Sequence, residues 1–425
     1  MSNAGWTKVG GYLRNQRLRQ AGSLYAAMIL TLIVGFVVSV INTRTLGPEG
    51  YGDLKFVNTV FQFLSVIGTL GLFTTGAQLL ALYRAEDKTK YELIGALTII
   101  SLVISGALIA VSVLFSFLQP ILFKNQLGNV TLIFSPIVGL LIFQASIEAM
   151  LQGDNRIHEL ALFRLAPGLL FMVSLVIVHY VFSLNVFITL LLLLATGVVI
   201  VLMYLKRLTP VYSNFPHHVR AIWQANKGYG WHVYIGTLSA VGTGYLSTFL
   251  ISYYLDNTKV GFFSLAVTLT LPLSQINGVV GTTYFKEFAH SNFLPPKVTL
   301  LTILLSAGTL IVFVLLIKPI VSIAYTNKFL EVASLASIIS TSAVLYGFGD
   351  YVNRFLGAHG QGKALRNVAI LVGIVNVAGY SVLIKMFGLQ GAAGTRILSG
   401  AMYCAAMLVY YRKFRKELLI SQPVG

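Results

Sequence analysis

Long apolar runs dominate this sequence, and they constrain its fold more than any other feature. Runs of about 20 or more mostly apolar residues recur along the chain, and an α-helix needs about 20 such residues to cross a lipid bilayer. Hydrophobic residues make up 56% of the 425 positions and charged residues only 10%, whereas a soluble domain carries about 25% charged residues. The sequence therefore predicts a membrane protein and excludes an ordinary soluble fold.

We expect about twelve transmembrane helices, because polar or glycine-containing segments divide the apolar sequence. The helices are expected near residues 22–45, 54–82, 92–119, 130–151, 161–182, 186–205, 229–251, 260–285, 298–317, 331–353, 367–387 and 391–411. Only helices or closed barrels satisfy their backbone groups in lipid, and runs of this length favour helices. The predicted fold class is an all-α polytopic membrane protein.

The distribution of basic residues predicts the topology. Most of the 30 lysines and arginines fall in the N-terminal segment, in the loops that follow the even-numbered predicted helices, and in the C-terminal segment. Cytoplasmic loops carry such an excess, so both termini are expected in the cytoplasm. The net charge of +17 is thereby explained without a nucleic-acid partner.

The chain contains an internal repeat. The loop "TRTLGPEGYG" at 43–52 matches "LDNTKVG" at 255–261, with Gly52 aligned on Gly261, and "QGDNR" at 152–156 matches "HGQGK" at 359–363. Parallel repeats of this kind are typical of transporters, whose substrate site lies between the halves. We expect two six-helix halves around a central cavity, with the parts listed here: 1–21 cytoplasmic, 22–205 N-terminal half, 206–227 cytoplasmic linker, 228–411 C-terminal half and 412–425 cytoplasmic tail.

The segments "NTRTLGPEGYGDLKFVNTVF" (42–61) and "LQGDNRIHELALFR" (151–164) resemble bacterial polysaccharide-biosynthesis flippases. These proteins belong to the multidrug/oligosaccharidyl-lipid/polysaccharide exporter superfamily. The resemblance covers the whole chain in span count, parallel halves and length. It implies a multi-pass protein of the bacterial cytoplasmic membrane that moves an undecaprenyl-type lipid-linked oligosaccharide, as in O-antigen synthesis, to the outer leaflet by alternating access.

The resemblance has further implications. An ion gradient of H⁺ or Na⁺ would drive active transport, since the chain has no ATP-binding motif, and partners would include membrane lipids and polysaccharide polymerase machinery. Two alternatives stay open. An ion-coupled multidrug or cation exporter of the same superfamily would have a cavity rich in carboxylates, and a non-transporting scaffold would have no central cavity.

Three cations are candidates for binding the anionic substrate. Arg396 lies inside the last predicted helix, whereas Arg44 lies at the end of the first predicted helix and Lys55 at the start of the second. Charges within spans are costly and usually face a polar cavity. The alternative is that each long side chain reaches the headgroups at the bilayer surface.

Three other charges are candidates for a gate or for ion coupling. Glu148 and Asp350 occupy corresponding helices of the two halves, and Arg354 follows Asp350 by one helical turn, a spacing that permits an ion pair. The alternative is local pairing of Asp350 with Arg354 and of Glu148 with Arg156.

Neutral polar side chains within the predicted helices are further candidates for the cavity. An amide in hydrocarbon needs a partner, which a neighbouring helix supplies as often as a ligand does. The candidates are Asn58, Gln62, Gln144, Gln275 and Asn277.

No catalytic chemistry is expected. The sequence has no HExxH, GxSxG or DxD motif, and the predicted outer loops are too short for a catalytic domain. No metal and no cofactor are expected, because the histidines are scattered; the one pair, His217–His218, is expected in a solvated loop. The glycines of the 43–52 loop and Pro48 are expected to reverse the chain between two helices.

Overall fold

The structure, a computed structural model, describes residues 16–83 and 88–421. In these residues the regular secondary structure is helical, without a strand. This confirms the predicted fold class. The helices are α2 (Gln16–Gly68), α3 (Leu72–Leu80), α4 (Lys88–Phe123), α5 (Gly128–Ile133), α6 (Pro136–Gly153), α7 (Ile157–Val181), α8 (Val186–Leu208), α9 (Phe215–Ala225), η1 (Asn226–Gly230), α10 (Trp231–Thr237), η2 (Leu238–Gly242), α11 (Thr243–Tyr254), α12 (Asn257–Thr283), α13 (Phe285–Ala289), α14 (Pro296–Tyr325), η3 (Asn327–Phe329), α15 (Leu330–Ala358) and α16 (Gly362–Ser421).

Ten stretches of the described chain are long and apolar enough to cross a membrane. Two of them are double, because α2 contains a non-helical residue at Gly47 and α16 contains one at Gly388. Each of these glycines separates two apolar segments that the sequence predicts as different spans. With both divided, the helices correspond to the predicted apolar runs, and α9 lies within the predicted linker.

The backbone at Gly47 shows why a glycine occupies this position. Its φ of 69° and ψ of −176° lie in a region that residues with a Cβ rarely adopt. Pro48 follows directly, and proline is favoured at the first position of a helix because its missing N–H is not needed there. Two helices therefore meet at Gly47 within α2, where the sequence predicts a break.

The chain divides into two compact units. Unit 1 takes in the described residues of Met1–Ile41, Ile67–Gln119 and Gln126–His232, and unit 2 those of Asn42–Val66, Pro120–Asn125 and Val233–Gly425. The hairpin around Gly47 therefore packs with unit 2, although its residues precede most of unit 1 in the sequence.

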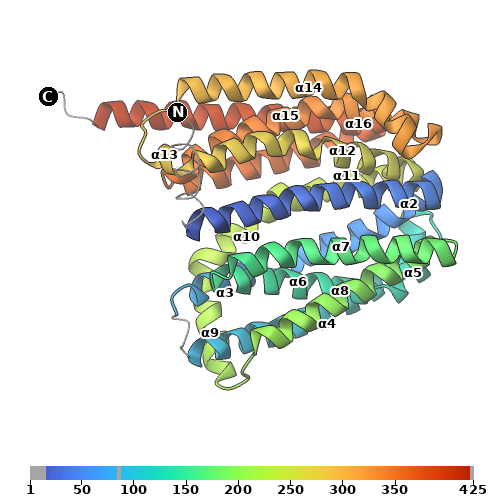
Figure 1. The fold of residues 1–425 in the computed structure, drawn as a ribbon, viewed down its shortest axis with the longest axis horizontal. Helices are drawn as coiled ribbons and strands as arrows, with labels where there is room; N and C mark the ends of the chain where they lie inside the picture. The colour runs from blue at the N-terminus through green and yellow to red at the C-terminus, as the bar shows by residue number, and fades with distance from the viewer. Residues whose placement is uncertain (1–15, 84–87, 422–425) are drawn as a thin grey trace, which may run out of the picture. The chain divides into compact units, whose positions relative to one another are not determined.

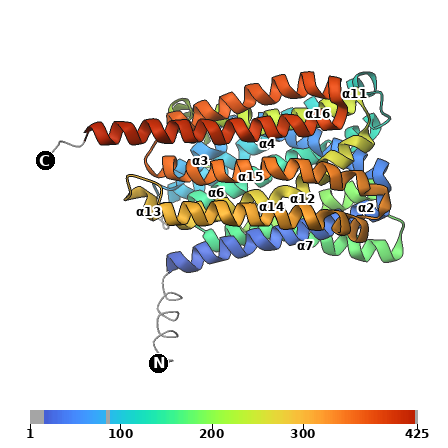
Figure 2. The ribbon, with the colours of Figure 1, turned by 90° about the horizontal axis from the view of Figure 1, so that it is seen from above.

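Within unit 2, α15 is the most enclosed helix and α14 the most exposed. Half of the apolar window of α15 is buried, against 17% for α14. The exposed side chains of α14 are mainly leucine, isoleucine and valine, which is expected where a helix faces lipid instead of water. Both views show the end of α16 extending beyond α14 and α15 (Figures 1 and 2).

Candidate functional site

A cavity of about 420 Å³ lies within unit 2, among η2, α11, α12, α15 and α16. Its lining is unusually polar for a membrane-spanning region. The polar residues that line it are Thr270, Ser274, Tyr346, Asp350, Asn353, Asn376, Tyr380, Arg396 and Tyr403. Of the residues predicted for the site, Asp350 and Arg396 line this cavity.

Asp350 is held by a tyrosine from another helix segment. The Tyr403 hydroxyl donates to Oδ1 of Asp350 at 2.7 Å, and Nδ2 of Asn353 donates to the same hydroxyl at 3.0 Å. The rings of Tyr346 and Tyr403 lie 5.3 Å apart. Asp350, on α15, is thus tied to α16, and the two rings give this part of the cavity an aromatic wall.

Arg396 supplies the positive charge of the cavity. Its backbone carbonyl accepts a hydrogen bond from Oγ of Ser342 at 2.6 Å, which fixes α16 against α15. Its guanidinium interacts electrostatically with Tyr346 and Tyr380 and hydrogen-bonds to Tyr380, yet its Nε is buried and has no hydrogen-bond partner. A buried donor without a partner is costly.

Asn376 joins three helical segments beside Arg396. Its Nδ2 donates to Oγ1 of Thr243 at 3.1 Å, and its Oδ1 accepts from Oγ of Ser399 at 2.5 Å. Both groups of the amide are therefore used, which fixes its orientation. Asn376 connects α11 with the two segments of α16 and supports the cavity wall.

Most of the polar lining was not predicted from the sequence, although its helical spacing is a signal for it. Tyr346, Asp350 and Asn353 follow one another at i, i+4 and i+7, and Arg396, Ser399 and Tyr403 at i, i+3 and i+7. Such spacings place side chains on one face of a helix. Polar faces on two otherwise apolar helices indicate a shared polar site, and only Asp350 and Arg396 are recognisable from charge alone.

The remaining charged candidates lie elsewhere. Glu148 on α6 pairs with Arg164 on α7, and Nε of Arg164 is 2.8 Å from Oε1 of Glu148. Glu148 does not pair with Arg156, which pairs with Glu159 at 2.7 Å.

Arg354 is exposed, and no ion pair with Asp350 is found among the described residues. A Cβ on Gly281 would lie 3.0 Å from Cγ of Arg354, so the stem of this arginine packs against α12.

The two cations near the 43–52 loop have local partners in unit 2. Arg44 donates from Nε to the carbonyl oxygen of Ala324 at 2.8 Å and from Nη2 to that of Ile323 at 2.5 Å. These carbonyls belong to the last turn of α14, where free acceptors and the helix dipole both favour a cation. Nζ of Lys55 lies 5.3 Å from the centre of the Tyr51 ring. Neither residue lines the cavity.

Two of the five amide candidates form hydrogen bonds within the protein. Gln62 accepts a hydrogen bond from the Tyr245 hydroxyl at 3.2 Å, and buried Asn277 accepts one from Ser306 at 2.6 Å. Gln275 is exposed, whereas Asn58 and Gln144 are half-buried. None of the five lines the cavity. The α12 helix continues through Pro272.

The two aligned glycines of the repeat meet in unit 2. A Cβ on Gly52 would lie 1.8 Å from the carbonyl oxygen of Asn257, and one on Gly261 would lie 3.0 Å from Cα and from N of Gly52. Nδ2 of Asn257 also donates to Oδ1 of Asp53 at 2.7 Å. The two repeated loops therefore pack backbone against backbone, which only glycine permits at this distance.

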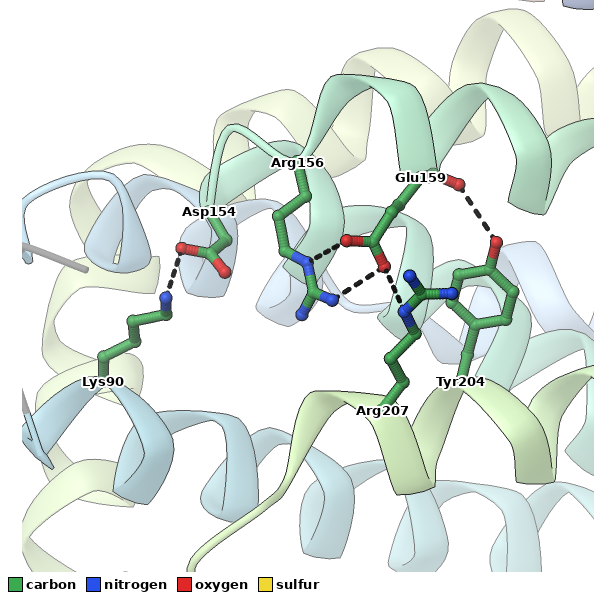
Figure 3. A network of polar contacts seen from close by, with 6 residues as sticks. All are labelled: Lys90, Asp154, Arg156, Glu159, Tyr204 and Arg207. Atoms are coloured by element: carbon green, nitrogen blue, oxygen red, sulfur yellow. Dashed lines mark hydrogen bonds and ion pairs between the residues drawn. The ribbon is translucent and has the colours of Figure 1, made fainter. Parts of the chain in front are cut away.

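Unit 1 contains a separate network of charges around the loop at 152–156 (Figure 3). Lys90 pairs with Asp154 at 2.7 Å, and Glu159 pairs with both Arg156 and Arg207, at 2.7 Å and 3.1 Å. The Tyr204 hydroxyl donates to the carbonyl oxygen of Glu159 at 3.3 Å. The first pair joins α4 to the end of α6, and the pairs of Glu159 join α7 to α8.

His218, which was expected in a solvated loop, is buried in the structure. It is 2% exposed, and its Nε2 lies 3.1 Å from Oε2 of Glu92. Ser213 and Asn214 donate to the same carboxylate at 2.7 Å and 3.0 Å. His217 and His218 are therefore not a solvated loop pair, because Glu92 on α4 binds His218 and the neighbouring residues of the linker. Among the described residues, no group of three or more potential metal ligands is found.

Comparison with solved structures shows the fold. A lipid II flippase, MurJ, in an inward closed conformation matches with a TM-score of 0.72 and 15% identity, over 93% of this chain and 90% of that chain. A multidrug resistance MATE family transporter of the MOP superfamily, in an inward-facing conformation, matches with a TM-score of 0.73 and 15% identity, over 92% of this chain and 96% of that chain. An outward-facing MATE structure matches with a TM-score of 0.62 and 15% identity, over 97% and 98%.

Sequence comparisons identify the family. Comparison with curated proteins gives no match. A family model described as "Polysaccharide biosynthesis protein" matches residues 18–285, which is more than half of the chain and includes both copies of the repeated loop. The chain therefore belongs to the polysaccharide biosynthesis protein family, and its fold is similar to those of the lipid II flippase and MATE transporter structures.

Proposed function

We propose that this protein moves a polyprenyl-diphosphate-linked oligosaccharide from the inner to the outer leaflet of the bacterial cytoplasmic membrane. Both termini would be cytoplasmic, as the basic loops favour. The family match and the lipid II flippase fold support transport of a lipid-linked sugar. The observation that carries the proposal is Arg396, which lines a polar cavity and whose buried Nε has no hydrogen-bond partner.

Arg396 would bind the diphosphate. A guanidinium matches phosphate oxygens in geometry and charge, and a partly enclosed site makes the interaction stronger than in water. The cavity of about 420 Å³ suits a headgroup fragment and not a whole oligosaccharide. Tyr346, Tyr380 and Tyr403 would contact the first sugar or the diphosphate through their rings and hydroxyls.

We propose that the halves 22–205 and 228–411 act as the moving bodies, joined by the linker at 206–227. The contact of Gly52 with Asn257 and Gly261 would close the outer side in one state and separate in the other. Polysaccharide polymerase machinery would use the product. No covalent step is needed for this cycle, so we propose that the protein is not an enzyme.

Energy would come from an ion gradient, with H⁺ or Na⁺ as the coupling ion. Asp350 is the group we propose for this role, because it lines the same cavity as Arg396. Glu148 is less suited, because Arg164 already neutralises it.

Export of cationic drugs is the second candidate function. The cavity carboxylate of Asp350 and its aromatic wall favour it, since both attract organic cations. Arg396 opposes it, because a fixed positive charge in the same cavity repels a cationic substrate.

A reconstituted transport assay separates the two functions. Purified protein in proteoliposomes is given a fluorescent lipid-linked oligosaccharide in one experiment and a cationic dye in another. The proposal predicts protein-dependent movement of the lipid and none of the dye. Movement of the dye alone would establish drug export instead.

A further inference from the structure

The end of α16 carries a group of basic side chains that the proposed transport cycle does not use. Arg412, Lys413, Arg415 and Lys416 are all exposed. Lys363 and half-buried Arg366, at the start of the same long helix, add to the basic character of this end of unit 2. We refer to the four residues Arg412, Lys413, Arg415 and Lys416 as the basic tail.

The basic tail is held in a defined orientation. Tyr411 and Phe414 contact Phe355 of α15, with ring centres 5.3 Å and 6.2 Å apart, and Phe414 also contacts His359 at 4.8 Å. The Tyr411 hydroxyl accepts a hydrogen bond from the backbone N–H of Leu294 at 3.1 Å. One face of the helix is therefore fixed on unit 2, and the basic residues occupy the opposite, open side.

The charges of the basic tail are not neutralised within the protein. Over residues 16–83 and 88–421, no ion pair joins any of the four to a carboxylate, and the single acidic residue of the tail region, Glu417, is itself exposed. In unit 1, by contrast, carboxylates pair with Lys90, Arg156 and Arg207. The basic tail therefore presents a concentrated positive charge to its surroundings.

The position of the basic tail along α16 places it at the level of lipid headgroups. Residues 389–410 are mostly apolar, and 22 helical residues span about 33 Å at about 1.5 Å per residue. The hydrocarbon core of a bilayer is about 30 Å thick. If residue 389 begins at one membrane surface, the basic tail begins at the other, where phosphate groups lie.

We propose that the basic tail is a binding surface for anionic phospholipid headgroups. Several exposed cations spread over two helical turns suit a layer of singly charged headgroups, whereas one diphosphate would require cations that converge on a pocket. Binding there fixes the end of α16 at the membrane surface. The same helix carries Arg396 and Tyr403. The proposal does not depend on the transported substrate.

The test is lipid retention by the full-length protein. The purified protein in detergent is incubated with equal amounts of phosphatidylglycerol and phosphatidylcholine, and the lipids that stay bound are counted by native mass spectrometry. A tail variant changes all four basic residues to glutamine. A matched control changes four exposed basic residues of unit 1 to glutamine: Lys88, Lys206, Arg220 and Lys227.

The proposal predicts that the natural protein prefers phosphatidylglycerol. Each basic residue near an anionic surface contributes up to about fivefold in affinity, so the tail variant should lose at least about fivefold of this preference, and clearly more of it than the control. Thermal unfolding in detergent should be unchanged in both variants, because the altered side chains are exposed.

Three results would overturn the proposal. The first is that the tail variant keeps the preference for phosphatidylglycerol. The second is that the unit 1 control loses this preference equally. The third is that millimolar inorganic pyrophosphate displaces the bound lipid from the natural protein. The last result would assign the basic tail to a single diphosphate headgroup.

Discussion

Arg396 is the residue on which the proposed chemistry depends most. A guanidinium in the interior of an apolar bundle normally forms hydrogen bonds with carboxylates or carbonyls. The Nε of Arg396, by contrast, is buried without a partner. Its neighbours Tyr346 and Tyr380 do not neutralise its charge. This arrangement is costly for stability and useful for binding an anion, so we attribute it to function.

Arg396→Ala should abolish most transport without unfolding the protein. Loss of a charged hydrogen bond to the diphosphate costs about 2–3 kcal/mol, which is a reduction of about 30-fold or more. The check is the rate of lipid-linked oligosaccharide movement in proteoliposomes. Arg396→Lys should retain part of the rate, because it keeps the charge, and Arg220→Ala at an exposed position is the matched control. If the Arg396→Ala variant transports at the natural rate, Arg396 does not bind the diphosphate.

Tyr403→Phe should destabilise unit 2. The substitution removes the hydroxyl that donates to Asp350 and accepts from Asn353, and interhelical hydrogen bonds in membrane proteins contribute about 1–2 kcal/mol at most. A lowered unfolding temperature in detergent checks this result. Tyr180→Phe, at a side chain that is 84% exposed, should change nothing. An equal effect of both variants would show that the Asp350 contact contributes no stability.

At the scale of helices, the repeated loops form a contact that depends on the absence of side chains. Gly52 and Gly261 lie on corresponding helices of the repeat, and each lacks room for a Cβ. Lys259 adds a second connection, since its Nζ lies 2.7 Å from a carboxylate oxygen of Glu331. The loops therefore define one discrete packed arrangement, as a gate requires.

Gly52→Ala should disfavour this arrangement. Overpacking of about 1–3 kcal/mol should slow disulfide formation between Asp53→Cys and Asn257→Cys by about fivefold or more, in a protein whose Cys404 is replaced. Gly35→Ala, where a Cβ meets nothing within 4 Å, is the control and should leave the rate unchanged. If the two alanine variants form the disulfide equally fast, the close contact does not control the gate.

Lys90→Met should destabilise unit 1, because it leaves Asp154 without its cation. The two side chains are 8% and 12% exposed, and removing one partner of a buried ion pair costs about 3–5 kcal/mol. The unfolding temperature of the variant should fall, and Lys90→Met with Asp154→Leu should recover part of the loss. Lys259→Met, from a pair that is 33% and 45% exposed, should change stability by less than about 1 kcal/mol. Equal effects of the two single variants would contradict this account.

At the scale of the whole molecule, the fold was largely predictable and the site was not. Membrane spans are visible in a sequence because lipid requires a long apolar run whatever its neighbours are. The hairpin at Gly47 was visible because glycine and proline have local backbone effects. The contacts of Asp350 with Tyr403 and of Tyr403 with Asn353 depend on how separate helical segments pack, which no single run of sequence contains.

The predicted pairs of charges show the same limit. The spacing of Asp350 and Arg354 permits an ion pair, but Tyr403 binds Asp350 and the stem of Arg354 packs on Gly281. Glu148 likewise finds Arg164 on the next helix instead of nearby Arg156. Helical spacing predicts which residues share a face, whereas tertiary contacts decide which of them bind each other.

The leaflet in which lipid-linked glycan accumulates after deletion of the gene from its native strain tests the central claim most directly. Spheroplasts are treated with a glycan-specific reagent that cannot cross the membrane, and a strain complemented with the Arg396→Lys variant is compared. The account predicts build-up on the cytoplasmic leaflet with loss of surface polysaccharide. Normal surface polysaccharide, together with increased sensitivity to cationic drugs, would contradict the flippase function and support drug export.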